Sequence, residues 1–167
     1  MAETLARKNL VQHIIEAAKD DERIVGLLDY GSSSEGRVAA TFDKVCGDFW
    51  YYLLYVFCKL QRGQHWFARE GYNAMVLGNL MALLKLEAGA LEHWQASSSA
   101  RDIEQAISPE RLARLNACIP GADAASLRHV LGVAAKLGQE VCEAIATRDK
   151  WEWPQTLAEQ AAALLAQ

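Results

Sequence analysis

The sequence has no apolar run long enough to cross a membrane. Its longest apolar stretch extends from Phe49 to Cys58, lies between Asp48 and Lys59, and falls well short of the roughly 20 residues that span a bilayer. The first 20 residues mix charged with apolar side chains and lack the continuous apolar segment of a secretory signal peptide. We therefore expect a protein of the cytoplasm that does not interact with membranes.

Clusters of basic residues are also missing. The chain has 17 Lys and Arg against 21 Asp and Glu, a formal net charge of -4, and no basic run or tail. Neutralising nucleic-acid phosphates requires clustered Lys and Arg side chains. The composition therefore argues against nucleic acid as a partner.

The spacings by which cysteine and histidine commonly hold zinc are absent as well. Neither Cys-x-x-Cys nor His-x-x-x-His occurs in the sequence. We predict that the cysteines are buried thiols, and that the histidines lie at the surface or at its boundary. These residues are Cys46, Cys58, Cys118 and Cys142, and His13, His65, His93 and His129.

Apolar residues recur every three or four positions over most of the chain, which is the spacing of helices with one buried face. The pattern predicts helices over residues 4–20, 41–61, 64–93 and 101–107, one that begins at Ser108, a long one after Asp123, and a last one through Leu164. Only Arg23–Tyr30 is short, apolar and β-branched, which favours a buried strand or else another helical turn. We therefore expect a mainly α protein, with a helix and a remnant strand in residues 1–40 and an up-and-down bundle of five or six helices in residues 41–167.

Three helix ends can be placed from single residues. Gly63 suits the left-handed conformation that follows the helix over residues 41–61. Ser108, which precedes Pro109, has the side chain of an N-cap, and Asp123 can cap the long helix after it.

The stretch LDYGSSSEGR, from Leu28 to Arg37, has the composition of a phosphate-binding loop. Gly31 lets the backbone approach an anion closely, and the Ser32 hydroxyl adds a donor to the backbone amides. An exposed turn has the same composition, so the loop alone does not decide between the two.

The wider context of this loop resembles a known family. AKDDERIVGLLDYGSSSEGR is similar to the start of the nucleotidyltransferase superfamily, in which a helix, a strand, a Gly-Ser loop and a second helix precede a pair of carboxylates. From Phe42 onward, FDKVCGDFWYYLLYVFCKLQRGQHWFAREGYNAMVLGNLMALLKL resembles the helical carboxyl-terminal domain of lincosamide nucleotidyltransferases. The resemblance implies Mg²⁺-dependent transfer of a nucleotide from a triphosphate to a hydroxyl group, such as one on an antibiotic.

The residues that this chemistry needs match only in part. The family places Asp-x-Asp or Asp-x-Glu after the loop and a third acid on a later strand, because carboxylates have to hold Mg²⁺. Asp43 falls where the first carboxylate belongs, but Val45 stands at the second position and nothing strand-like follows. Asp48 does not replace it, because a separation of five residues places two side chains more than about 100° apart around a helix.

We therefore interpret the chain as a relative of these enzymes whose central catalytic sheet is missing. It is expected to be a non-catalytic module for binding or dimerisation that needs no cofactor. The alternative is an active nucleotidyltransferase in which Gly31 and Ser32 hold a nucleoside triphosphate and Asp43 holds Mg²⁺, with further acids from another chain. A truncated product without a selected role is the third interpretation.

Aromatic residues wrap more of the helix predicted over residues 41–61 than one buried stripe requires. Either this helix is central in the bundle, or a second chain or an apolar ligand covers part of it. The candidate surface consists of Trp50, Tyr51, Tyr52, Tyr55, Trp66 and Tyr72. A strand without its sheet would expose an apolar edge, so we expect Ile24–Tyr30 to be helical or paired with a second copy, and the protein to be a homodimer.

Overall fold

The computed structural model describes residues 35–90 and 98–165. The chain divides into two compact units, Met1–Ser33 and Ser34–Gln167, and all described residues belong to the second unit. The predicted helix over residues 4–20, the strand or helix over residues 23–30 and the Gly-Ser loop lie outside the described residues.

All secondary structure in the described ranges is helical, so the prediction of a mainly α bundle is confirmed. The helices are α2 (Glu35–Gln61), α3 (His65–Gly71), the π-helical turn η1 (Tyr72–Val76), α4 (Leu77–Glu87), α6 (Ile103–Ala106), α7 (Pro109–Asn116), α8 (Ala124–Asp149) and α9 (Gln155–Leu165). Within these ranges, no helix combines the length and the apolar character that crossing a bilayer would require.

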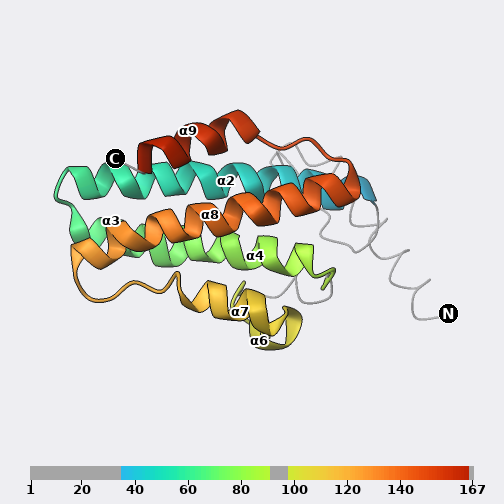
Figure 1. The fold of residues 1–167 in the computed structure, drawn as a ribbon, viewed down its shortest axis with the longest axis horizontal. Coiled ribbons are helices and arrows are strands. Elements are labelled where there is room, and N and C mark those ends of the chain that lie inside the picture. The colour runs from blue at the N-terminus through green and yellow to red at the C-terminus, as the bar shows by residue number, and fades with distance from the viewer. Residues whose placement is uncertain (1–34, 91–97, 166–167) are drawn as a thin grey trace, which may run out of the picture. The chain divides into compact units, whose positions relative to one another are not determined.

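Helix α2 is the central element of the bundle, which explains the breadth of its apolar surface. It contacts α3, η1, α4, α8 and α9, and Figure 1 shows α8 and α4 alongside it on one side and α9 on the other. The segment that contains the short helices α6 and α7 returns the chain to the end of the bundle at which α4 begins. Helix α8 therefore runs in the same direction as α4 (Figure 1).

The three helix ends expected from single residues are confirmed. Gly63 follows α2 with a φ of 70°, in the left-handed region where glycine is least strained. The Ser108 hydroxyl accepts a hydrogen bond from the Arg111 amide at 3.2 Å, and Asp123 Oδ1 accepts one from the Ser126 amide at 2.8 Å. These side chains satisfy amides that the first turn of a helix leaves free.

The helix predicted over residues 64–93 differs from the structure in its end and in its continuity. It ends at Glu87 and is followed by Gly89 with a φ of 72°, so the predicted end at His93 is wrong. The π-helical turn η1 interrupts it and shifts the register of the following residues. Within this turn, Met75 is 42% exposed, whereas Tyr72 and Val76 are buried.

The start of α2 also differs from the prediction. The helix begins at Glu35, earlier than the expected start at Thr41. Its first turns therefore fall in the segment that was assigned to the amino-terminal part of the chain.

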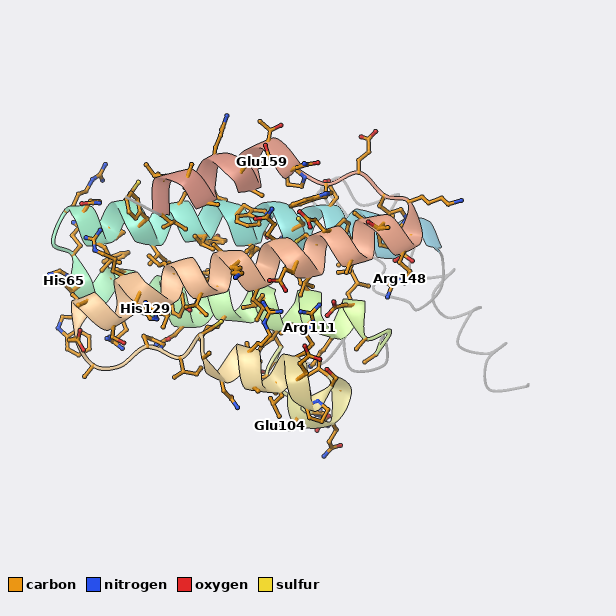
Figure 2. All side chains as sticks on the ribbon, in the orientation of Figure 1. His65, Glu104, Arg111, His129, Arg148 and Glu159 are labelled. Atoms are coloured by element: carbon orange, nitrogen blue, oxygen red, sulfur yellow. The ribbon has the colours of Figure 1, made fainter. Side chains whose placement is uncertain are left out.

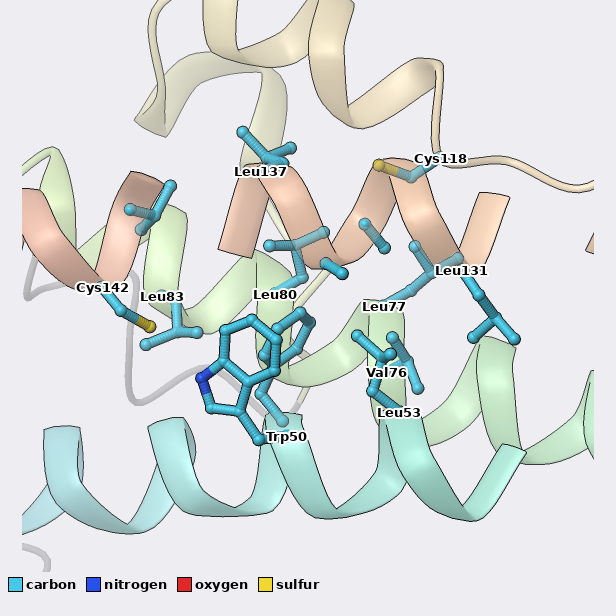
Figure 3. Close-up of a cluster of buried hydrophobic side chains, with 14 of the residues drawn as sticks. Trp50, Leu53, Val76, Leu77, Leu80, Leu83, Cys118, Leu131, Leu137 and Cys142 are labelled. Carbon is cyan, nitrogen blue, oxygen red and sulfur yellow. The ribbon is translucent and has the colours of Figure 1, made fainter. Parts of the chain in front are cut away.

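The core lies between α2, the η1–α4 segment and α8. Figure 3 shows Trp50 and Leu53 of α2 facing Val76, Leu80 and Leu131 across this space. Burial of apolar side chains is the main favourable contribution to folding, so this three-sided contact is what fixes the bundle.

Lys85 of α4 is the exception in this core, because it is a buried charged residue. Its Nζ donates a hydrogen bond to the Arg101 carbonyl oxygen at 2.6 Å, which partly replaces the lost hydration. Burial lowers the pKa of Lys85, and the nearby Asp102 carboxylate acts in the opposite direction. The lysine thus ties α4 to the turn before α6.

Candidate functional site

The predicted metal residue, Asp43, lies exposed on α2. Val45 is partly buried and packs against the core, and Asp48 accepts a hydrogen bond from Lys44. Among residues 35–90 and 98–165, no three His, Cys, Asp or Glu side chains are grouped so that they could hold a metal ion. Asp43 therefore does not belong to a described metal-ligand cluster, and Gly31 and Ser32 lie outside the described residues.

Two members of the predicted aromatic surface are core residues, which corrects that prediction. Trp50 and Tyr72 are fully buried, because α2 is covered by α4 and α8 on the side that carries Trp50. The Tyr72 hydroxyl donates a hydrogen bond to the Cys118 carbonyl oxygen at 2.7 Å, and burial raises the pKa of Tyr72. Neither side chain is available to a partner or a ligand.

The remaining aromatic residues do reach the surface. Tyr51 is 59% and Trp66 85% exposed, while Tyr52 and Tyr55 are partly buried. The rings of Tyr51 and Tyr52 lie edge to face with centroids 5.1 Å apart. Lys59 Nζ lies 5.0 Å from the Tyr55 ring centroid and covers part of this strip of α2. That a second chain binds here stays a prediction.

Three of the four cysteines are buried as predicted, whereas Cys58 is exposed and corrects the expectation for that residue. Cys46 Sγ and Cys142 Sγ lie 3.3 Å apart. The contact with Cys46 and burial raise the pKa of Cys142, and burial raises that of Cys118 to about 11. Because the thiolate is the reactive form, Cys118 and Cys142 are poor nucleophiles at neutral pH.

An open cleft of about 720 Å³ lies where α2 gives way to α3 and where α8 begins. Its polar lining residues are the cations Arg128 and Lys136 and the histidines His65 and His129, and Figure 2 shows His65 and His129 at the same end of the bundle. Both histidines are exposed, as predicted.

Sequence reasoning missed this cleft, because only tertiary packing brings His65 next to α8. The usable signal was the spacing of Arg128, Gly132 and Lys136. Residues four apart lie on one face of a helix, so this spacing places two cations on the same face with a glycine between them.

The model of the streptomycin adenylyltransferase family matches residues 37–167, which is most of the chain. The chain belongs to this family. The expected membership in the nucleotidyltransferase superfamily is thereby confirmed, and the matching family is named for streptomycin rather than for lincosamides.

One solved relative supports the fold of this streptomycin adenylyltransferase family member. The chain is similar to an aminoglycoside 6-adenyltransferase from Bacillus subtilis, with a TM-score of 0.70 and 16% sequence identity. The match covers 81% of this chain and 55% of the relative, so the chain spans little more than half the length of that protein. At this identity the likeness shows the fold alone. No curated protein matches the chain.

Proposed function

We propose that the chain is a helical binding module of the streptomycin adenylyltransferase family that does not transfer adenylyl groups on its own. The observation that carries this proposal is the isolation of Asp43. It is the one acid at the position expected for a metal ligand, it lies exposed on α2, and the second position of the pair is Val45, which packs against the core.

The chemistry of adenylyl transfer explains why this isolation matters. When bound, Mg²⁺ neutralises the charge that develops on the attacking and leaving oxygens, and proteins hold it with carboxylates. Asp43 and Asp48 of α2 cannot share one ion, because they diverge around the helix and Asp48 is engaged by Lys44. The described residues therefore do not fit the metal, and we expect no cofactor.

The alternative is an active adenylyltransferase that modifies a hydroxylated antibiotic. It is favoured by the family match and by the name of the solved relative, an aminoglycoside 6-adenyltransferase. In this case Gly31 and Ser32 would hold the nucleotide, Asp43 would hold Mg²⁺, and the missing acids would come from another chain.

A transfer assay separates the two functions. The purified chain is incubated with ATP, Mg²⁺, streptomycin and a panel of other hydroxylated antibiotics, and pyrophosphate release is followed. We expect no release above the level without enzyme. Turnover that is lost in Asp43→Asn but kept in Asp48→Asn, its matched control on the same helix, would overturn the proposal.

Calorimetry gives a second measure, since the alternative requires Mg²⁺-dependent ATP binding that Ser32→Ala weakens.

We also propose that the module forms a homodimer in the cytoplasm. The exposure of Tyr51 and Trp66 supports it, because large exposed aromatic side chains are typical of interaction surfaces. An apolar ligand on the same surface is the competing occupant. Sedimentation equilibrium that detects only monomer at high protein concentration would contradict the dimer.

A further inference from the structure

The cleft beside the start of α8 is positively charged, whereas the chain as a whole is negatively charged. The whole sequence has a net charge of -4, yet the cleft is lined by two permanent cations, Arg128 and Lys136, and two histidines, His65 and His129, without a carboxylate among its lining residues. A pocket lined by charges of one sign raises the local concentration of ions of the other sign.

Arg111 and Arg114 form salt bridges with carboxylates, but among the described residues the cations of the cleft do not. In the described part of the chain, none of the four side chains forms a salt bridge with a carboxylate. Two acids of α8 and its cap are bound by other groups: Asp123 accepts a hydrogen bond from the Ser126 amide, and Glu140 accepts one from Arg114 at 2.8 Å. Lys136 also lowers the pKa of Glu140, but the two side chains form no described salt bridge. An anion from solution would therefore add a directly bound counter-charge to the cleft.

The geometry leaves room for such an anion between the two permanent cations. Arg128, Gly132 and Lys136 follow one another at intervals of four residues on α8, so their positions share one face. Gly132 is exposed, and a Cβ atom built there would have no neighbour within 4 Å. The glycine thus leaves open the helix surface between the positions of Arg128 and Lys136. The Arg128 guanidinium lies over the Phe57 ring, with Cζ 6.0 Å from the ring centroid.

The rest of the lining is apolar, which indicates that the ligand is more than a bare ion. Leu60, Val133 and Leu165 contribute to it, and a second hollow of about 230 Å³ shares His65 with the cleft and is bordered by the exposed ring of Trp66. Volumes of several hundred Å³ with an apolar lining and a few converging polar groups are typical of small-molecule sites.

We propose that this cleft binds an organic phosphate, with the phosphate group between Arg128 and Lys136 and an apolar body against Leu60 and Val133. This inference rests on the proposed function, because it names the ligand class of the binding module. The same charges would repel a polycation such as an aminoglycoside, so the cleft is not a site for the antibiotic.

Calorimetric titration of the full chain with phenyl phosphate, without Mg²⁺ and at low ionic strength, tests the proposal. We expect saturable binding that weakens about tenfold in Arg128→Gln and in Lys136→Gln, since each removes a charge-assisted hydrogen bond. Binding should also weaken as salt is added. Gly132→Leu should abolish binding by filling the cleft without changing its charge.

The matched control is Arg101→Gln, which removes an exposed guanidinium from the turn before α6, away from the cleft. It should bind phenyl phosphate as the unmodified chain does. Absence of saturable binding, an equal loss in the control, or equal affinity for phenol would overturn the proposal, and equal affinity for inorganic phosphate would overturn the part played by the apolar body. Circular dichroism of each variant verifies that it is folded.

The two proposals fail separately. Antibiotic adenylylation with intact phenyl phosphate binding contradicts only the non-catalytic function. Absence of both activities contradicts only the organic phosphate site.

Discussion

At the scale of single residues, Gly138 lets α8 approach α2 closely. A Cβ atom built on Gly138 would lie 2.3 Å from Cε1 and 2.4 Å from Cζ of Phe49. The Phe49 ring is itself fully buried and lies edge to face on Trp50, with centroids 5.0 Å apart. A methyl group at Gly138 would therefore have to displace this buried ring or push α8 away from α2.

Gly138→Ala should lower the free energy of unfolding by about 1–3 kcal/mol, the usual cost of an added methyl group in a filled core. Gly132 provides the matched control, because it lies on the same helix and a Cβ atom built there would have no neighbour within 4 Å. Gly132→Ala should raise stability by about 0.5–1 kcal/mol, since alanine favours the helix. Urea unfolding of both variants measures the difference, and a stabilised Gly138→Ala variant would show that α2 and α8 are not packed this closely.

At the scale of helices, features set by neighbouring residues could be predicted from the sequence, and features set by packing could not. Gly63, Ser108 and Asp123 mark helix ends through contacts with residues a few positions away. The exposure of Met75 and the burial of Lys85 depend instead on the π-helical turn and on the Arg101 carbonyl, respectively. Neither feature can be recognised from apolar residues that recur every three or four positions.

Helix α7 is attached to the bundle mainly by charged contacts. Leu115 is its one buried residue, while Leu112 is partly buried against the core. Arg111 Nε donates to Glu87 Oε2 at 3.0 Å, and Arg114 forms two hydrogen bonds with Glu140 of α8. The position of this helix should therefore depend on pH.

Arg114→Gln should lower the free energy of unfolding by about 0.5–1 kcal/mol at neutral pH, a range typical of partly exposed ion pairs, since the two side chains are 33% and 38% exposed. The hydrogen bond from Arg114 lowers the pKa of Glu140 below its usual value of about 4.5. The pair thus stabilises the fold fully above the unfolded-state pKa, and this contribution is lost as the pH falls through the lowered pKa of the native state. The difference between the two proteins in urea unfolding should shrink from pH 7 to pH 3.

The control for this pH dependence is Arg62→Gln, which removes an exposed arginine without a described carboxylate partner. Its effect on stability should be the same at both pH values. If Arg114→Gln were equally destabilising at pH 3 and pH 7, the bond to Glu140 would not be what holds α7.

At the scale of the whole molecule, the family could be predicted from the sequence better than the site. The superfamily follows from the Gly-Ser loop and from the pattern of residues 42–86, and the match over residues 37–167 confirms it. The cationic cleft, by contrast, joins His65 to residues more than sixty positions away on α8. Such a site forms only when the helices pack together, so no short sequence motif predicts it.

The bundle should fold without the first unit of the chain. All buried residues of the described core cluster lie between Phe42 and Ala161. The partly buried residues that pack against this cluster extend only to Leu165. A fragment of residues 34–167 is long enough to form its own core. It should unfold in one cooperative transition, with a melting temperature within about 4 °C of that of the full chain, which corresponds to about 1 kcal/mol.

Thermal unfolding followed by circular dichroism at 222 nm, with the full chain under the same conditions as the control, measures this. A broad, non-cooperative transition of the fragment would show that the bundle needs the first unit to close its core. A cooperative fragment that still binds phenyl phosphate would place the binding function within the bundle, as expected if the cleft at the start of α8 is complete in residues 34–167.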